Sequence, residues 1–247
     1  LNSSQTSLFS DATNETYQDL TVPPCESWSN LIRLKKEKEV VGIYISSHPL
    51  DDFTHEMKHF MNISLNSLGD LAPLVNREFS LGGIVNDVQH LESRNGKGWA
   101  RFALEDFTDQ YEFRIFGEEY LKYRHFLVVN QFIRIRLSVR EGWVNRETGK
   151  VGAPRMQFLH FEMLQNTIES NAKKLTLQLD IHQLKENEIL ALKDNLRAYK
   201  GTQSLIFSVY DPSKKVKLVL NSSKQKVKIT SELLHYLDEA DWHYKLN

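Results

Sequence analysis

EFSLGGIVNDVQHLES, residues 78–93, is the stretch that decides the fold of the central part of this chain. Phe79 and Leu81 alternate there with polar residues, which is typical of a strand that has one buried face. The Gly82-Gly83 pair interrupts the alternation, and paired glycines inside a strand predict a bulge or a sharp bend. The sequence therefore predicts that the central domain begins with one long, bent strand.

The residues after this strand keep the period of two, with one interruption. RNGKG is a turn signal at the end of the first strand, and Thr108-Asp109 make the next turn. The predicted strands are 78–93, 99–107, 111–116, 132–144 and 154–164, and the predicted helix is 118–128. Three strands, a helix and two further strands are the order of an OB-fold barrel, so we expect such a barrel over residues 77–165.

The segments on either side of the barrel differ from it in composition. Residues 1–30 are rich in Ser, Thr, Asn and Asp, so we expect a flexible linker. Residues 31–76 are predicted to be helical, and residues 166–247 to form a small α/β tail domain with a short strand at 225–229. The predicted fold class is therefore mixed. It is mainly a β OB-fold barrel of five strands plus one helix, with a helical N-terminal segment and a small C-terminal α/β domain.

Two helices are predicted within the helical segment. The first begins after Ser29, and the spacing of its apolar side chains predicts that four of them pack inward: Val40, Val41, Ile43 and Tyr44. Pro49 pushes the residue before it out of the helical region, so the first helix must end by then. A second helix is expected from Asp51 to about Met61, with an acidic residue near its N-terminus.

Composition limits the class of protein. The 247 residues contain 31 Lys and Arg against 32 Asp and Glu, so a uniformly basic nucleic-acid coat is excluded and any such contact must be local. No apolar run is long enough to span a bilayer, and no signal peptide opens the chain, so no membrane partner is expected. One cysteine, Cys25, fits a reducing cytoplasm. Leu1 in place of a methionine indicates a piece of a longer protein.

His55-Glu56-Met57-Lys58-His59 matches the HExxH motif of zinc hydrolases. On a helix this spacing places two imidazoles on one face for Zn²⁺ and leaves the glutamate to activate water. A protease of that class also needs a sheet beside the helix, and the residues upstream are mostly linker and one helix. We therefore interpret the motif as a solvated helix face, keep a zinc metallohydrolase as an alternative, and predict no metal site.

The predicted barrel is better evidence for binding single-stranded nucleic acid. OB-folds stack bases on aromatic side chains of the central strands and pair the backbone with Lys and Arg from the loops. The candidates are Arg94, Lys97, Trp99, Arg101, Phe113, Arg114, Arg140, Trp143, Arg146 and Lys150. Alternation places Phe102 and Leu104 on one face and Trp99 with Arg101 on the other, so Trp99 is the expected exposed ring. The other interpretation is that these aromatic residues fill a small barrel that binds only protein.

No arrangement for catalysis is recognisable in the sequence. Cys25 lies in the predicted linker without a positioned base, and no pair of carboxylates or phosphate-binding loop stands out. We therefore predict no catalytic residues and no cofactor in this chain.

Three segments resemble the C-terminal third of the alpha subunit of bacterial DNA polymerase III, the C-family replicative polymerase. They are EKEVVGIYISSHPLDDF at 37–53, FSLGGIVNDV at 79–88 and GWARFALEDFTDQYEFRIF at 98–116. The match departs from the family pattern at Ser47 and at Asp109, where glycine is usual, and it covers the last 80 or so residues by position only. Membership would make the whole protein a DNA-directed DNA polymerase, a nucleotidyltransferase whose Mg²⁺-binding aspartates lie upstream of Leu1.

The resemblance gives the predicted linker a function. The family carries a sliding-clamp motif there, a glutamine followed after two residues by leucine and phenylalanine, and Gln5, Leu8 and Phe9 match it. Leucine and phenylalanine side chains of an extended peptide can fill an apolar pocket while the amide makes polar contacts. The resemblance further implies that the barrel contacts single-stranded template DNA and that the tail domain docks the tau subunit of the clamp loader. The implied partners are therefore the sliding clamp (beta subunit), single-stranded DNA and the tau subunit, and the implied role is processive DNA replication.

Overall fold

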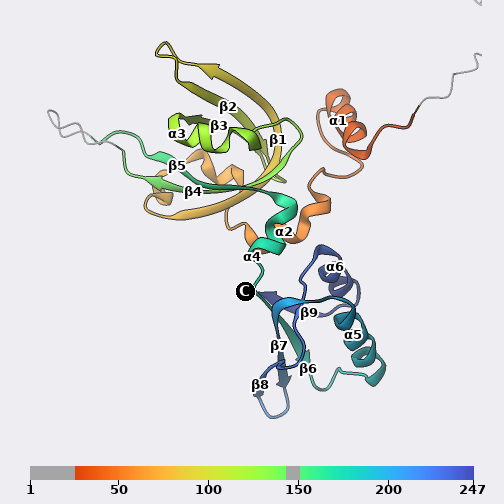
Figure 1. Ribbon diagram of the computed structural model, residues 1–247. Coiled ribbons are helices and arrows are strands. Elements are labelled where there is room, and N and C mark those ends of the chain that lie inside the picture. The colour runs from red at the N-terminus through yellow and green to blue at the C-terminus, as the bar shows by residue number, and fades with distance from the viewer. Residues whose placement is uncertain (1–25, 143–150) are drawn as a thin grey trace, which may run out of the picture. The chain divides into compact units, whose positions relative to one another are not determined.

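The computed structural model describes residues 26–142 and 151–247 (Figure 1). They fall into two compact units, which divide between Ser46 and Ser47. Within the described residues no helix is both long and apolar enough to cross a membrane.

The described part of the first unit is built on helix α1, Asn30–Val41. The Ser29 side chain accepts a hydrogen bond from the Ile32 amide at the N-terminus, and Gly42 ends the helix in the left-handed conformation with φ of 90°. This early end overturns one prediction. Val40, Val41 and Ile43 are exposed, not packed inward: the two valines are the last residues of α1, and Ile43 follows Gly42, where the chain leaves the helical path. Tyr44 is half-buried, with the Lys38 ammonium 4.7 Å from its ring centre.

The second unit begins with short helices that lead into a sheet. A 3₁₀ turn, Asp51–Phe53, continues into helix α2, Thr54–Phe60, where the second helix was predicted. Two more 3₁₀ turns follow, Leu65–Gly69 and Ala72–Leu74. The first of them buries Leu65 and Leu68 in the core under the sheet.

A five-stranded antiparallel sheet forms the middle of the chain, in the predicted order of elements. Its elements are β1 Glu78–Glu92, β2 Gly98–Glu105, β3 Gln110–Phe116, helix α3 Gly117–Tyr123, β4 Phe132–Arg140 and β5 Arg155–Met163. The strands lie in the order β3-β2-β1-β4-β5. Within the described residues β3 and β5 are the two edges of this sheet, so a closed barrel is not seen and the predicted mixed class is what the structure confirms.

Strand β1 is long and bent because it serves both halves of the sheet. Its first half pairs with β4 and its second half with β2, and the register shifts between Val85 and Asp87, downstream of the predicted glycine bulge. The glycines serve close packing instead. A Cβ atom on Gly83 would lie 2.4 Å from the Glu105 carbonyl oxygen, and one on Gly82 would lie 2.7 Å from the Met57 sulfur.

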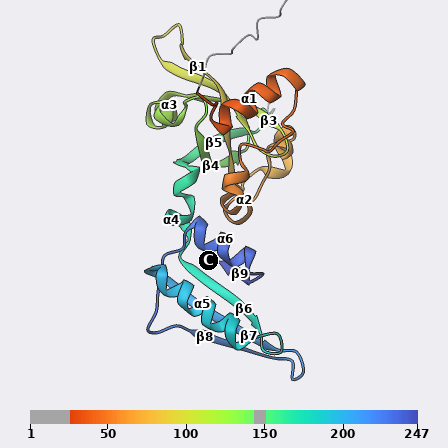
Figure 2. The same ribbon diagram turned by 90° about the vertical axis from the view of Figure 1, so that its right-hand side faces the viewer.

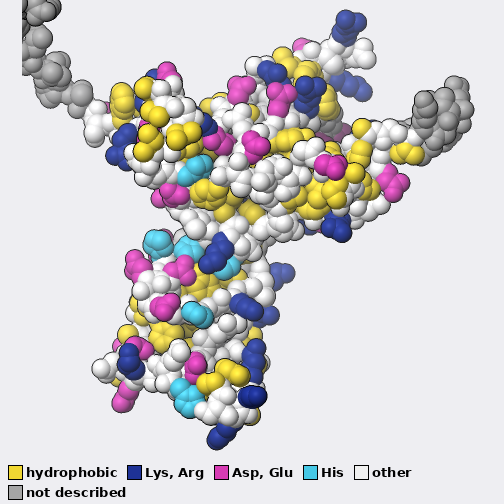
Figure 3. Space-filling view, turned by 180° about the vertical axis from the view of Figure 1, so that it is seen from behind, with side chains coloured by type: hydrophobic (Ala, Val, Ile, Leu, Met, Phe, Trp, Pro, Cys, Tyr) yellow, Lys and Arg dark blue, Asp and Glu magenta, His cyan; other side chains and the backbone are white. Residues whose placement is uncertain are grey.

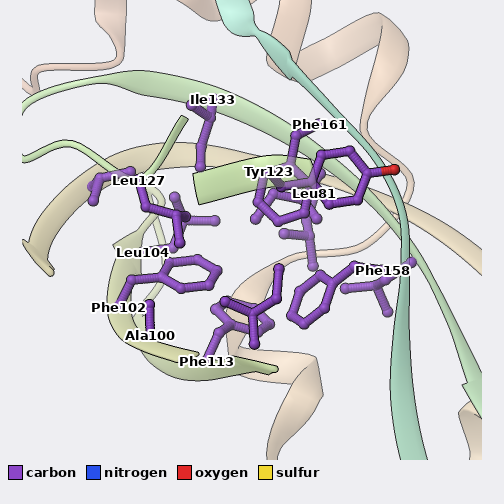
Figure 4. Close-up of a cluster of buried hydrophobic side chains, with 14 of the residues drawn as sticks. Leu81, Ala100, Phe102, Leu104, Phe113, Tyr123, Leu127, Ile133, Phe158 and Phe161 are labelled. Atoms are coloured by element: carbon purple, nitrogen blue, oxygen red, sulfur yellow. The ribbon is translucent and has the colours of Figure 1, made fainter. Parts of the chain in front are cut away.

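The core of this sheet is rich in aromatic side chains (Figure 4). Phe102 and Phe113 stack with ring centres 5.2 Å apart, and Phe158 and Phe161 close the cluster from β5. The Tyr123 hydroxyl of α3 donates a hydrogen bond to the Leu159 carbonyl. Helix α3 therefore closes one side of the core, as a helix between the third and fourth strands can.

The C-terminal part is a smaller α/β layer with its own core (Figure 2). Its elements are α4 Thr167–Asn171, β6 Lys174–Asp180, α5 Glu186–Ala198, β7 Lys200–Asp211, β8 Val216–Asn221, α6 Ser231–Glu239 and β9 His243–Leu246. The strand order is β8-β7-β6-β9, with β6 and β7 parallel on either side of α5 in sequence. The predicted strand at 225–229 is wrong, because Val227 makes only isolated bridges to Lys200 and Gln203. Strand β9 was not predicted.

Candidate nucleic-acid interface

The outer face of β2 and β3 carries the aromatic and basic side chains that the sequence analysis singled out. Alternation along β2 sends Ala100, Phe102 and Leu104 into the core and leaves Trp99 and Arg101 on the opposite, partly exposed face. Trp99 pairs in register with Phe116 of β3, and Arg101 pairs with Arg114. Directly opposed residues of antiparallel strands share a face, so these four side chains form one patch.

Trp99 and Phe116 form a stacked pair on this patch. Their ring centres are 5.2 Å apart with 18° between the planes. Phe116 is 56% exposed and Trp99 is half-buried, and the partly exposed Leu91 of β1 lies opposite Trp99 in register. Two rings held flat on a sheet and reached by solvent are the kind of platform on which a base can stack.

The same face carries two arginines that one carboxylate holds in place. Glu112 lies 3.3 Å from Arg101 through one oxygen and 3.3 Å from Arg114 through the other. All three side chains are at least a third exposed, so these ion pairs contribute little to stability. Glu112 therefore orients the guanidinium groups beside the aromatic pair, and a phosphate can replace it as their partner.

One of the predicted contact residues belongs to the core. Phe113 is buried and stacks on Phe102, so its assignment as a nucleic-acid contact is wrong. Phe116, three positions later on the opposite face, was not among the predicted contacts and is the exposed ring that stacks on Trp99. The alternation of Phe113 and Ile115 into the core would have identified it, because it leaves Arg114 and Phe116 outside.

Helix α3 fixes the end of the sheet at which the aromatic pair lies. The Tyr120 ring packs against Gly98 so closely that a Cβ atom there would lie 2.6 Å from it. Its hydroxyl lies 3.2 Å from His90 Nδ1 of β1. Glycine at this position therefore lets α3 support the start of β2, next to Trp99.

The predicted loop residues are partly described. Arg94 and Lys97 are exposed in the turn between β1 and β2, which closes through the Ser93 amide and the Lys97 carbonyl at 2.9 Å. Arg140 is exposed at the end of β4 and donates to Gln157 at 3.1 Å. Trp143, Arg146 and Lys150 lie outside the described residues, as do Gln5, Leu8 and Phe9 of the clamp motif.

The HExxH segment is a packed surface, which corrects its interpretation as a solvated helix face. His55 and Glu56 are buried where α2 meets α6 and β9. The Ser231 hydroxyl donates to Glu56 at 2.9 Å, His55 Nε2 lies 3.3 Å from His235 Nδ1, and the ring centres of His59 and Tyr244 are 5.5 Å apart. Phe60 of the same helix belongs to the tail core.

Tyr244 contacts both imidazoles, since its hydroxyl lies 3.4 Å from His55 Nδ1 and its ring packs against His59. Burial lowers the pKa of both His55 and His59 and raises the pKa of Glu56, so the neutral forms are favoured. In the part of the chain that the structure describes, no group of three or more His, Cys, Asp or Glu side chains is placed to hold a metal ion. The motif is thus a hydrogen-bonded contact between α2 and the tail.

Comparison with known proteins points to one family. Residues 175–247 match the family described as DNA polymerase III alpha subunit, C-terminal domain. The DNA polymerase III subunit alpha of Borreliella burgdorferi is 31% identical over 207 residues, which is 79% of this chain and 16% of that protein. The Mycobacterium tuberculosis (strain H37Rv) protein of the same name is 23% identical over 202 residues, 81% of this chain and 16% of that protein.

A third relative covers less of the chain. The DNA polymerase III subunit alpha of Treponema pallidum is 28% identical over 114 residues, 46% of this chain and 10% of that protein. The chain thus spans about 16% of the length of the curated relatives it matches over most of its length. The tail, which lies outside the three segments that resemble the family, is the part that the family domain matches directly. This chain therefore belongs to the DNA polymerase III alpha subunit family and corresponds to its C-terminal region.

Proposed function

We propose that this chain is a non-catalytic binding module of a replicative DNA polymerase. It binds single-stranded template DNA through the outer face of β2 and β3, the sliding clamp through Gln5, Leu8 and Phe9, and the tau subunit of the clamp loader through residues 166–247. Polymerisation itself, with its Mg²⁺, belongs to other parts of the longer protein. Together these contacts would keep the polymerase on its template.

The observation that carries the DNA part is the exposed Trp99–Phe116 stack beside Arg101 and Arg114. The strand order supports it. An OB-fold is a five-stranded, partly open Greek-key barrel with its ligand-binding face on the second and third strands. The order β3-β2-β1-β4-β5, with a helix between β3 and β4, is that of such a barrel opened between the third and fifth strands. We therefore assign an OB-fold to residues 77–165 as part of this proposal.

Binding of DNA is tested by titrating the chain with an oligo-dT strand and following tryptophan fluorescence. We expect binding that weakens steeply as salt rises, because the arginines displace counterions from the phosphates. Phe116→Ala should weaken binding by about 5- to 150-fold, since stacking contributes about 1–3 kcal/mol per base. Phe107→Ala is the aromatic control, because Phe107 is similarly exposed but lies in the turn at the other end of β2.

The arginine contacts have a matched control in the same sheet. Arg114→Ala should weaken DNA binding, whereas Arg136→Ala should leave it unchanged. Arg136 is an exposed arginine of β4 that pairs with Glu78 of β1. If wild-type chain binds no oligonucleotide at low salt, the sheet is a protein-binding scaffold and the DNA part of the proposal is wrong. Equal losses of DNA affinity in Phe116→Ala and Phe107→Ala would show that the Trp99–Phe116 stack is not part of the DNA-binding site.

The clamp part of the proposal is tested with purified sliding clamp. Replacing both Leu8 and Phe9 by alanine should weaken binding about 30-fold or more, because truncating anchor side chains costs about 2 kcal/mol or more. Leu20→Ala, in the same N-terminal segment, is the control. Equal affinity of the double variant and the wild type would disprove the motif.

A further inference from the structure

The tail sheet ends in a strand whose apolar side chains are exposed. Strand β8 is an edge of the four-stranded sheet, and Val216, Leu218 and Leu220 are each about half exposed. Leu218 and Leu220 pair in register with Val209 and Phe207 of β7, so they share the face of the sheet on which α5 packs. This face is therefore apolar beyond the part that α5 covers.

A groove runs between α5 and this uncovered strip. Its volume is about 340 Å³. Ile189, Leu192 and Leu196 of α5 form one wall, and Phe207, Val209 and Leu220 form the other. Ile189 remains 44% exposed although it lies on the helix face that buries Leu192 and Leu196. The groove is thus lined by apolar side chains from both walls, which is an unusual surface to leave in water.

The width of the strip fits one α-helix. Neighbouring strands lie about 4.8 Å apart, so β7 and β8 together present a strip about 10 Å wide. An α-helix with its side chains is about 10–12 Å across. In the described part of the chain, no helix lies on β8 beside α5, so one additional helix would complete the layer.

The charge around the groove selects the kind of helix. Five lysines around the groove are exposed: Lys193 on α5, Lys214 and Lys215 in the β7–β8 turn, and Lys224 and Lys226 after β8. Among the described residues, none of these five is in an ion pair. Among the nearby acids, Glu188 and Asp194 of α5 pair with Lys185 and Arg197, and Asp211 accepts the Ser213 and Lys214 amides, while Glu186 at the start of α5 is exposed. Figure 3 shows Lys and Arg side chains gathered along one margin of this domain. The rim is positive and attracts acidic groups.

We propose that the groove between α5 and β7–β8 docks an amphipathic helix of a partner protein, with its apolar stripe in the groove and acidic residues facing the rim lysines. The inference rests on the proposed function, which makes residues 166–247 a protein-docking domain, and it names the surface and the chemistry of the segment that binds there. A helix, rather than a strand added to the edge of β8, is the occupant because three of the four exposed apolar side chains of β8, namely Val216, Leu218 and Leu220, lie on the groove face.

The two faces of β8 provide the test. Leu218 is 54% exposed on the groove face, and its neighbour Val219 is 55% exposed on the opposite face. In the full chain, Leu218→Glu should weaken binding of the cognate tau subunit by about tenfold or more, whereas Val219→Glu should leave it unchanged. Lys193→Glu should also weaken binding, with Lys217→Glu on the opposite face as its control. Equal losses at 218 and 219 overturn the helix-in-groove assignment, and circular dichroism verifies that both variants fold.

A designed probe separates the groove from the identity of the partner. An amphipathic peptide helix with a leucine stripe and glutamate flanks should bind the wild-type chain and Val219→Glu but not Leu218→Glu, and the same peptide with lysine flanks should bind at least tenfold more weakly. Binding of this peptide without binding of tau would support the groove and disprove tau as the partner. Failure to bind either one overturns the inference. A dimer in solution that Leu218→Glu dissociates would also overturn it, since the occupant would then be a second copy.

Discussion

The ion pair between Arg134 and Glu162 is enclosed where β1, β4 and β5 meet the start of the tail, and removing one partner is expected to destabilise the second unit strongly. Arg134 donates to Glu162 at 2.5 Å and to the Ser80 hydroxyl at 2.9 Å, and Asn171 of α4 donates to the same Glu162 oxygen at 2.9 Å. The two charged side chains are only 9% and 13% exposed. Glu162→Ala would leave the guanidinium buried without its counter-charge.

The cost follows from that burial. Breaking a buried pair by removing one partner costs about 3–5 kcal/mol, because an uncompensated charge remains in a poorly solvated place. In a protein of this size, 1 kcal/mol lowers the melting temperature by about 2–4 °C, so Glu162→Ala should lower it by roughly 6–20 °C. Thermal unfolding followed by circular dichroism measures this shift.

The same strand supplies a matched control. Arg136 and Glu78 also form an ion pair at 3.0 Å, but their side chains are 45% and 63% exposed. Exposed pairs contribute about 0–1 kcal/mol, so Glu78→Ala should lower the melting temperature by less than about 4 °C. Replacing Arg134 and Glu162 together by methionine should recover most of the loss. Equal shifts in Glu162→Ala and Glu78→Ala would refute the reasoning from burial.

Two further predictions concern β1 and α2. Gly83→Ala should lower the free energy of unfolding by about 1–3 kcal/mol, because its Cβ would lie 2.4 Å from a backbone oxygen. Gly69→Ala is the control: no atom lies within 4 Å of its Cβ, so it should change the free energy of unfolding by less than about 0.5 kcal/mol. Urea denaturation measures both variants, and equal effects would contradict the close approach at Gly83. His55 and His59 have pKa values lowered from 6.5 by burial, so as pH falls below about 6.5 the unfolded chain takes up protons first and stability should fall. Glu56, whose pKa burial raises, acts in the opposite sense, since it favours the folded state as pH falls. His59→Leu should therefore flatten the loss of melting temperature on acidification, and an unchanged pH profile would show that His59 does not contribute.

The aromatic residues of β2 and β3 illustrate how far periodicity alone can go. Alternation correctly placed Trp99 and Arg101 outside the core, because a strand with one buried face forces that pattern. The same rule applied to β3 would have excluded Phe113 and selected Phe116. The error came from choosing a residue by its chemistry before assigning it to a face. The Trp99–Phe116 stack itself depends on the register between two strands, which neither strand encodes by itself.

Other errors arose where a contact joins residues far apart in the chain. Val40 and Ile43 look like one helical stripe, but Gly42 ends the helix between them. His55 and Glu56 look like an exposed motif, and they are buried because His235 and Ser231, about 180 residues later, pack on them. Strand β9 was missed because its pairing with β6 is what makes it a strand.

The sequence by itself determined the order of elements in the five-stranded sheet, the face of β2 that meets the core and the resemblance to a polymerase subunit, because each of these depends on local spacing and residue type. The tertiary structure decided the rest. It set the open order β3-β2-β1-β4-β5, brought α2 onto the tail core and left the β7–β8 strip uncovered beside α5. Those features depend on which distant surfaces pack together, and periodicity shows that a face is buried without showing which distant segment covers it.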